Sequence, residues 1–211
     1  GRNFEYISED PRLTSELVVP IVRGIETSDV AACVKHFAMN NQETERLWVN
    51  VEADERTMRE IYFPAFQAVV QKAGAKSIMG SYNLIRGTHV CENKDIMGTV
   101  LRKEWGFNGF VYSDLSSIEG ITGARVAQNH KEASVLALKA GVDMDLGGNA
   151  YGKNLRQALK EKLIGMQDID GRLPIYSVSN SVWDYSKTRM YLLRKPDGRY
   201  APGHIRNWHA K

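Results

Sequence analysis

The chain contains 211 residues, of which 43% are hydrophobic and 25% are charged, so it has the composition of a globular protein with one sizeable core and not that of a disordered chain. Its net charge of +3 is unevenly distributed, because residues 1–171 carry 20 Lys and Arg against 23 Asp and Glu (net −3), whereas residues 172–211 carry 8 against 2 (net +6). The body of the chain has neither a basic stripe that would indicate a nucleic-acid partner nor a run of about 18 apolar residues that would span a membrane.

Helix and strand signals alternate along the first part of the chain. Asp10 and Pro11 open a helix that we expect to run to about residue 25. Residues 31–38 form a short apolar run, which is typical of a buried strand. Asp54 then opens a second helix that ends at Gly74, and its apolar residues have the spacing of one buried face. These residues are Met58, Ile61, Tyr62, Ala65, Phe66 and Val69.

The same alternation continues to about residue 163. We expect strands at residues 76–83, 110–115 and 142–146, and helices at residues 94–104, 131–140 and 152–163. This order is typical of parallel βα units, which build either an open doubly wound sheet or a (β/α)8 barrel.

The positions of the polar residues favour the barrel. They fall at the carboxyl ends of successive strands, which form the rim where barrel enzymes carry their chemistry. These residues are Lys35, His36, Tyr82, Asn83, Asp114 and Asp143. A complete barrel has eight strands and about 250 residues. We therefore predict an α/β fold in which about four to five βα units form part of a TIM-type barrel, followed by an irregular tail.

Two features of this rim indicate a functional site. The strand that begins at residue 110 ends abruptly on Asp114, which we interpret as a catalytic carboxylate. The alternative is an acid that only caps the next helix. Lys35 and His36 are the second feature, because burying either side chain at a strand end requires a polar partner.

Four motifs closely resemble the N-terminal barrel domain of family 3 glycoside hydrolases, the β-glucosidase and β-xylosidase group. They are Gly-Arg-Asn-Phe-Glu-Tyr-Ile-Ser-Glu-Asp-Pro at residues 1–11, Lys-His-Phe-Ala and Asn-Asn-Gln-Glu within residues 35–43, Ser-Tyr-Asn at residues 81–83, and Trp-Gly-Phe-Asn-Gly-Phe-Val followed by Ser-Asp within residues 105–114. Their order and spacing also resemble those of the family. The resemblance covers residues 1–170, which we interpret as one partial domain.

The resemblance implies a retaining glycosidase mechanism in which Asp114 is the nucleophile. It also implies that Arg2, Lys35, His36 and Tyr82 bind the hydroxyl groups of the sugar. Charged donors suit this role because they make the stronger hydrogen bonds, and nearby cations would keep Asp114 ionised. The implied substrate is a β-linked glucoside, xyloside or oligosaccharide, and the implied site needs no cofactor and no metal.

Several departures from the family pattern accompany the resemblance. Leu115 stands where members usually have Trp, which removes a platform for the leaving group. The first barrel strands, with an aspartate that grips the sugar, are not among these residues, and neither is the general acid that most members carry in a following domain. A subgroup has a histidine after the Lys-His-Phe motif instead, but residues 39–46 contain none. Glu43 and Asp143 are weaker candidates, which we interpret as supporting or capping acids.

Two functions therefore stay open. One is hydrolysis of β-glycosidic bonds by descent, with the isolated chain incomplete. The other is that of a non-catalytic carbohydrate-binding or structural remnant of a truncated glycosidase. In both cases we expect exposed sheet edges to promote self-association. The first residues lack the basic-then-apolar order of a secretory signal, so the sequence does not fix the localisation, and the family resemblance favours the periplasm or secretion.

The tail at residues 171–211 has neither helical nor strand periodicity and does not resemble the family. One hypothesis is a shift of reading frame near Gly171. With permissive codons, residues 180–191 can encode Lys-Phe-Arg-Met-Gly-Leu-Phe-Glu-Asn-Pro-Tyr-Val in a shifted frame, which looks like the family's linker after the barrel. Residues 203–211 can similarly encode His-Pro-Glu-Leu-Ala-Arg-Gln, which looks like the start of the next domain. A genuine basic extension that binds a partner is the alternative.

Overall fold

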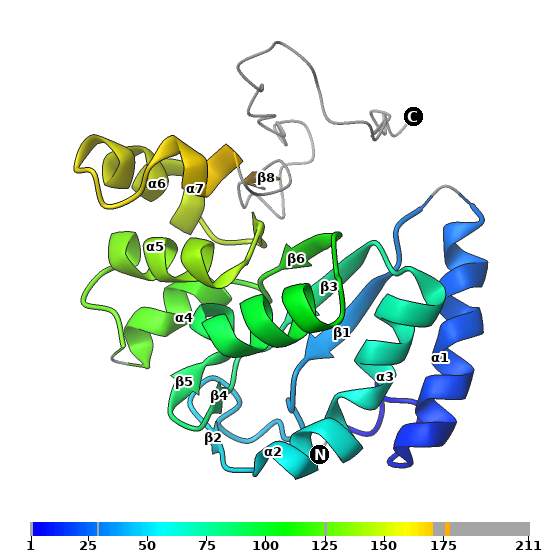
Figure 1. Ribbon diagram of the computed structural model, residues 1–211. Coiled ribbons are helices and arrows are strands. Elements are labelled where there is room, and N and C mark those ends of the chain that lie inside the picture. Colours follow the sequence, from blue (N-terminus) through cyan, green and yellow to red (C-terminus); the bar gives the residue numbers. More distant parts are fainter. Residues whose placement is uncertain (1, 29, 125, 171–175, 178–211) are drawn as a thin grey trace, which may run out of the picture.

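Five parallel strands form the central sheet of the computed structural model, which describes residues 2–28, 30–124, 126–170 and 176–177 (Figure 1). The strands follow one another in the sheet as they do in the chain: β1 (Cys33–Phe37), β3 (Ser77–Gly80), β6 (Phe110–Tyr112), β7 (Met144–Asp145) and β8 (Tyr176–Ser177). Every adjacent pair is parallel, and the register places Ile78 between Val34 and Val111. The predicted strands and their parallel arrangement are confirmed.

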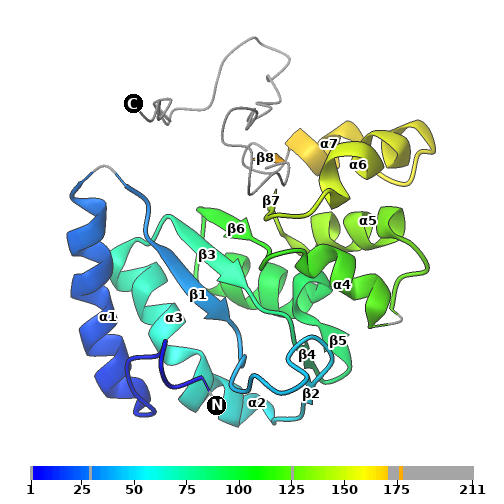
Figure 2. The same ribbon diagram turned by 180° about the vertical axis from the view of Figure 1, so that it is seen from behind.

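Helical segments connect these strands. Helix α1 (Pro11–Glu26) precedes β1. The segments between β1 and β3 are α2 (Glu55–Thr57), η1 (Met58–Tyr62), α3 (Pro64–Ala68) and η2 (Val69–Ala73). Those between β3 and β6 are η3 (Val90–Glu92) and η4 (Lys94–Glu104), and the later ones are α4 (Ser117–Gly123), α5 (His130–Ala140), α6 (Ala150–Lys160) and α7 (Met166–Asp170). Seen from behind, β1 and β3 lie in front of α3 (Figure 2), so the helix covers one face of these strands. The described residues therefore form part of a TIM-type barrel, as predicted.

The largest part of the core joins β1 to the helices behind it. Phe37 of β1 is fully buried, and its ring centroid lies 5.1 Å from that of Phe66, 5.6 Å from that of Trp105 and 5.7 Å from that of Phe63. Burying an aromatic side chain of this size contributes about 2–3 kcal/mol. The aromatic cluster therefore fixes the strand that carries Lys35 and His36 against α3 and the end of η4.

The helical stretch before Gly74 is present, but its buried face differs from the prediction. Met58 and Phe66 are buried as expected, whereas Ile61 is 48% exposed and Phe63 is 1% exposed. The reason is the wide, π-type turn of η1, in which the backbone N–H of Phe63 donates to the carbonyl oxygen of Met58, five residues back. This turn inserts an extra residue and rotates the following side chains, so that a regular helical spacing no longer identifies the buried face.

A second, three-stranded sheet lies outside the predicted elements. It consists of β2 (Asn50–Val51), β4 (Leu84–Ile85) and β5 (Thr88–His89), in which β4 and β5 form an antiparallel hairpin. Arg86 and Gly87 make the turn with φ values of 50° and 76°. Strands of two residues are too short to show an alternating pattern in the sequence, so these strands could not be predicted. The helices η3 and α7 are likewise too short to show a helical repeat.

Helix α1 has apolar residues on two opposite sides, of which one is buried and the other is exposed. Val19 and Val22 are buried in a cluster with Val69. On the other side, four apolar residues that are each 44–50% exposed follow one another at a spacing of four residues: Leu13, Leu17, Ile21 and Ile25. Strand β1 is the first strand in the sheet and is paired only with β3 within the described residues. This exposed ridge of α1 and the free edge of β1 leave one flank of the structure uncovered.

Among the residues that the structure describes, no helix combines the length and the apolar character needed to cross a bilayer. The tail, for which we predicted a frame shift or a basic extension, lies outside the described residues apart from Tyr176–Ser177, which form β8.

Candidate active site

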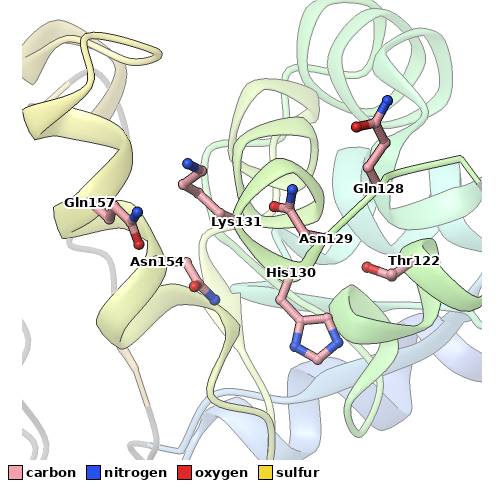
Figure 3. A pocket seen from close by; sticks show the side chains of 7 residues that line it. All are labelled: Thr122, Gln128, Asn129, His130, Lys131, Asn154 and Gln157. Atoms are coloured by element: carbon pink, nitrogen blue, oxygen red, sulfur yellow. The ribbon is translucent and has the colours of Figure 1, made fainter.

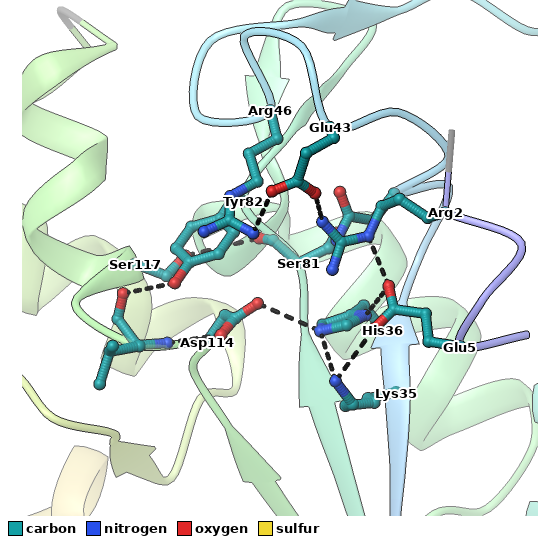
Figure 4. Close-up of polar contacts among 12 residues, drawn as sticks. Arg2, Glu5, Lys35, His36, Glu43, Arg46, Ser81, Tyr82, Asp114 and Ser117 are labelled. Carbon is teal, nitrogen blue, oxygen red and sulfur yellow. Dashed lines mark hydrogen bonds and ion pairs between the residues drawn. The ribbon is translucent and has the colours of Figure 1, made fainter.

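The predicted site residues lie together at the carboxyl ends of three neighbouring strands (Figure 4). Lys35 and His36 belong to the last part of β1, Tyr82 follows β3 and Asp114 follows β6. Because the strands are parallel and adjacent, these ends meet at one edge of the sheet. Arg2 joins the group from the segment that precedes α1. The structure thus brings all five predicted residues into one cluster.

Asp114 is the carboxylate at the centre of this cluster and is 8% exposed. Its Oδ1 atom accepts a hydrogen bond from the backbone N–H of Leu115 at 2.7 Å, and its Oδ2 atom lies 3.4 Å from Nε2 of His36. The backbone beside it is tied to the next strand, because Leu146 donates its backbone N–H to Oγ of Ser113 at 2.9 Å and accepts from the N–H of Ser116 at 2.9 Å. The carboxylate is therefore held on a rigid support and is not a capping acid, since none of its side-chain contacts is with the N–H groups of α4.

His36 is a buried imidazole, 4% exposed, with polar contacts at both ring nitrogens. Its Nδ1 atom lies 3.2 Å from the hydroxyl of Tyr6, which itself donates to the carbonyl oxygen of Asn40 at 3.3 Å. Tyr6 can therefore accept from Nδ1–H, so we assign the ring proton to Nδ1, which leaves Nε2 to accept from Nζ of Lys35 at 3.3 Å. Burial lowers the pKa of His36, and the attraction of Asp114 for the charged form does not fully offset this effect. The ring is neutral at neutral pH.

Glu5 connects three of the predicted residues and was missed by the sequence analysis. Its carboxylate accepts from Nε of Arg2 at 2.5 Å and from Nζ of Lys35 at 3.2 Å, and it lies 3.6 Å from Nδ1 of His36. Burial opposes ionisation of Glu5, but the hydrogen bonds from Arg2 and Lys35 outweigh it and lower the pKa of this carboxyl. The available signal was its place in the same motif as Arg2, three residues further along the chain.

Tyr82 occupies the opposite side of the cluster. Its hydroxyl donates to the carbonyl oxygen of Leu115 at 2.8 Å, and burial together with the negative charge of Asp114 raises the pKa of the phenol. The guanidinium carbon of Arg46, a residue not singled out from the sequence, lies 5.1 Å from the centre of the Tyr82 ring. Arg46 also pairs with Glu43 at 2.9 Å, and Glu43 pairs with Arg2. Glu43 is thus a supporting acid, as expected.

Asp143 does not belong to the cluster. It is fully buried, accepts from Nη2 of Arg102 at 2.5 Å and accepts from the backbone N–H of Val111 at 2.8 Å. These contacts hold β6 and β7 at their correct spacing, in agreement with its interpretation as a supporting acid. Asp10 caps α1 by accepting from the N–H groups of Arg12 and Leu13.

In the described residues, neither a metal site nor a second pocket coincides with the cluster around Asp114. No group of three or more His, Cys, Asp or Glu side chains within residues 2–28, 30–124, 126–170 and 176–177 is arranged to hold a metal ion. A polar hollow lies between α4, α5 and α6 (Figure 3), and none of the five predicted residues lines it. Its walls are Thr122, Gln128, Asn129, His130, Lys131, Asn154 and Gln157.

The chemistry of the cluster follows from the state of its charged groups. Glu5 and Glu43 are both paired with Arg2, whereas the Asp114 carboxylate lies beside a neutral imidazole, accepts a backbone N–H and is close to the Tyr82 side chain. Asp114 is therefore the carboxylate of this cluster that is suited to attack an electrophile, and Lys35, which is 46% exposed in its side chain, is a donor that a ligand can reach.

Comparisons with known proteins agree with this arrangement. The model of the glycosyl hydrolase family 3 N-terminal domain matches residues 1–174. A beta-glucosidase of Bacteroides ovatus is 51% identical over 114 residues, which cover 54% of this chain and 15% of that protein. An exo-alpha-(1->6)-L-arabinopyranosidase of Bifidobacterium longum is 40% identical over 170 residues, which cover 81% of this chain and 21% of that protein.

A solved structure shows the same fold. The crystal structure of beta-glucosidase from Listeria innocua in complex with glucose superposes with a TM-score of 0.76 at 32% sequence identity, and the match covers 81% of this chain and 25% of that one. The chain therefore spans a quarter or less of these relatives. The family model, which extends over most of the chain, and the matching fold show that the chain belongs to glycosyl hydrolase family 3 and represents part of its N-terminal domain.

Proposed function

We propose that this chain carries the nucleophile and part of the sugar-binding site of a retaining β-glycosidase, with Asp114 as the nucleophile. The observation that carries the proposal is the position of Asp114, whose carboxylate lies at the strand ends beside His36 and within a group of hydrogen-bond donors. Membership of the family and the beta-glucosidase names of its relatives support the same reaction class.

In the first step, an oxygen of Asp114 forms a bond to the anomeric carbon of the sugar, and the bond from that carbon to the leaving oxygen breaks. The leaving oxygen keeps the electron pair and takes a proton from a general acid. Water then attacks the anomeric carbon and the bond between that carbon and Asp114 breaks, with the electron pair returning to the carboxylate. The proton of the water passes to the deprotonated general acid, and the sugar leaves with its original configuration. Lys35, His36, Arg2 and Tyr82 hold the sugar hydroxyls in this scheme.

The nucleophile and the general acid of the proposed reaction are different groups. Two other carboxylates, those of Glu5 and Glu43, belong to the cluster. Both are paired with Arg2 and are not free to donate a proton. The general acid of the proposed reaction is therefore not among the carboxyl groups of this cluster. A leaving group that departs without protonation makes the nucleophilic step observable by itself.

The experiment uses 2,4-dinitrophenyl 2-deoxy-2-fluoro-β-glucoside, because dinitrophenolate leaves without an acid and the fluorine slows release of the covalent intermediate. Intact-mass and peptide mass spectrometry should show one fluoroglucosyl group on the peptide that contains Asp114. Asp114→Asn should abolish the label, and Asp95→Asn, which changes an exposed acid at the start of η4, should retain it. A label on another residue, or a label that survives Asp114→Asn, contradicts the proposal.

The sugar is tested with matched probes. The corresponding fluoroxyloside, and an aryl α-L-arabinopyranoside suggested by the name of the Bifidobacterium longum relative, should react more slowly than the glucoside if glucose is the preferred sugar. Faster reaction with either probe would reassign the preference while leaving the role of Asp114 intact.

A second candidate function is carbohydrate binding without catalysis. The pairing of both neighbouring carboxylates with Arg2 favours it for the isolated chain, since a glycosidase needs a second, proton-donating group. Glucose binding measured by calorimetry, together with no label at Asp114, would support this function over the first.

A further inference from the structure

Glu5 holds the basic residues of the site from the side that faces away from the nucleophile. It contacts Arg2, Lys35 and His36 at once, and its side chain is only 13% exposed. It approaches Nδ1 of His36, whereas Asp114 approaches Nε2 of the same ring. Figure 4 shows Glu5 and Asp114 on opposite sides of His36. Glu5 therefore does not touch the attacking carboxylate and acts through its neighbours.

Lys35 is the neighbour whose position depends most on Glu5. Its side chain is long and 46% exposed, so that an unanchored ammonium group would sample many rotamers. The structure places Nζ of Lys35 3.3 Å from Nε2 of His36, and this Nε2 atom of His36 lies 3.4 Å from Oδ2 of Asp114, so the Lys35 ammonium group and the Asp114 carboxylate approach the same ring nitrogen. A small rotation would therefore bring the Lys35 ammonium group to Asp114.

Such a movement would harm the proposed reaction. An ammonium group that donates hydrogen bonds directly to the carboxylate occupies the oxygen that attacks the sugar and lowers its nucleophilicity. It also withdraws a donor from the sugar hydroxyls. The Glu5 carboxylate accepts a hydrogen bond from Nζ of Lys35 at 3.2 Å, in competition with Asp114, and accepts another from Nε of Arg2 at 2.5 Å. The pair of cations is thereby held beside the nucleophile without closing on it.

We infer that Glu5 is a positioning residue that keeps Lys35, Arg2 and His36 aimed at the sugar and keeps Lys35 off Asp114. This role rests on the proposed function and adds a residue to it. It differs from a simple contribution to stability because it predicts that the effect of removing Glu5 depends on the presence of Lys35.

The kinetic test measures the rate of fluoroglucosyl labelling at Asp114 in a set of four proteins: wild type, Glu5→Gln, Lys35→Met and the double variant. Glu5→Gln should slow labelling by on the order of 10- to 100-fold, as expected for misplacement of groups around a reacting centre. In the Lys35→Met background the same substitution should have an effect several times smaller, because no ammonium group remains to move. Glu9→Gln, an exposed acid of the same segment, should label like wild type.

The outcomes separate the possibilities. Wild-type labelling in Glu5→Gln, or an equal effect of Glu5→Gln in both backgrounds, overturns the inference. Thermal melting of each variant identifies a rate that is lost only through unfolding, and Glu5→Asp, which keeps the charge, should recover part of the rate if the fold is intact.

A second measurement does not need the reaction. The carboxylate of Glu5 favours the charged form of His36, so an NMR titration of the His36 ring should give a lower midpoint in Glu5→Gln than in wild type and an unchanged one in Glu9→Gln. If wild type is not labelled at Asp114, the proposed function fails, whereas the titration still decides whether Glu5 controls His36. An unchanged His36 midpoint in Glu5→Gln contradicts the positioning role.

Discussion

Nε2 of His36 lies 3.4 Å from Oδ2 of Asp114. The buried His36 ring separates Asp114 from Glu5, which lies near its other nitrogen, Nδ1. Burial lowers the pKa of His36, so the ring stays neutral at neutral pH and does not form a strong ion pair with Asp114. On protonation, Nε2–H would donate to the carboxylate and compete with attack on the sugar. The relationship between these two residues therefore makes the nucleophile sensitive to acid through its neighbour.

The first prediction concerns this acid limb. The labelling rate at Asp114 should stay level as the pH falls through 6.5, the ordinary histidine pKa, and should drop only at lower pH. His36→Gln should label more slowly at neutral pH and should change the shape of the acid limb, because the titrating neighbour is gone. Measured rates between pH 4 and 8 check this, with the exposed His130→Gln as the control. Identical pH profiles for wild type and His36→Gln would contradict the coupling.

The second prediction concerns Tyr82. Tyr82→Phe removes the hydrogen bond to the carbonyl oxygen of Leu115, which holds the backbone next to the nucleophile at 2.8 Å. We expect a loss of about 1 kcal/mol in the free energy of unfolding and a labelling rate that falls by more than the unfolded fraction explains. Denaturant unfolding and labelling measure the two effects separately. Tyr62→Phe, a partly exposed tyrosine of η1, should change neither one appreciably.

The third prediction concerns His89, which is 1% exposed and accepts from the backbone N–H of Cys91. Burial lowers its pKa to about 4 from an ordinary value of 6.5, so the unfolded chain takes up a proton at a higher pH than the folded chain. The contribution of His89 to stability is therefore complete above pH 6.5 and is lost as the pH falls towards 4. The difference corresponds to about 3 kcal/mol.

His89→Asn tests this contribution, because Asn keeps a capping oxygen and does not titrate. As the pH falls from 7 to 4, wild type should lose up to about 3 kcal/mol of stability that His89→Asn does not lose, so the variant should become more stable relative to wild type by that amount. The comparison must be with the variant, since burial raises the pKa of Asp145 to about 6 and gives wild type an opposite dependence, with stability lost as the pH rises through 6. A difference that is constant with pH would show that His89 does not titrate in this way.

The fourth prediction concerns Gly109, which precedes β6. A Cβ atom there would lie 2.2 Å from the backbone oxygen of Lys76 and 2.7 Å from its carbonyl carbon. Gly109→Ala should therefore destabilise the fold by about 1–3 kcal/mol, because the backbone beside β3 must move. Gly24→Ala is the matched control, since a Cβ atom at that position in α1 meets nothing within 4 Å, and it should stabilise the helix by about 0.5–1 kcal/mol. Equal melting temperatures for the two variants would contradict the close approach.

The fifth prediction concerns self-association, which the exposed ridge of α1 and the free edge of β1 favour. Wild type should show concentration-dependent dimers or larger species in light scattering. Leu17→Glu, in the middle of the ridge, should shift the population towards monomer, whereas Ile61→Glu, an exposed apolar residue of similar accessibility on η1, should not. A wild-type chain that stays monomeric at high concentration would exclude self-association. Equal behaviour of the two variants would show that association does not use the ridge of α1.

The strands and the residues at their ends could be predicted because their signals are local. An apolar run that stops at Lys35 and His36, or at Asp114, marks both a buried strand and the end that a barrel uses for chemistry. Glu5 does not stand at the end of a strand, and two of its three partners, Lys35 and His36, lie about thirty residues away and are brought close only by the fold. The exposed position of Ile61 was mispredicted because a π-type turn breaks the regular helical repeat.

The contact between His36 and Asp114 joins residues 78 positions apart (114 minus 36), and the whole β3 unit lies between them. Closing so long a stretch of chain costs entropy that only an assembled sheet repays, so we expect this contact to form late in folding. The site is therefore a sensor of completed folding: titration of His36 or labelling of Asp114 reports the fraction of chains in which β1, β3 and β6 have already come together. Kinetic refolding experiments could use either signal as a probe of the last step.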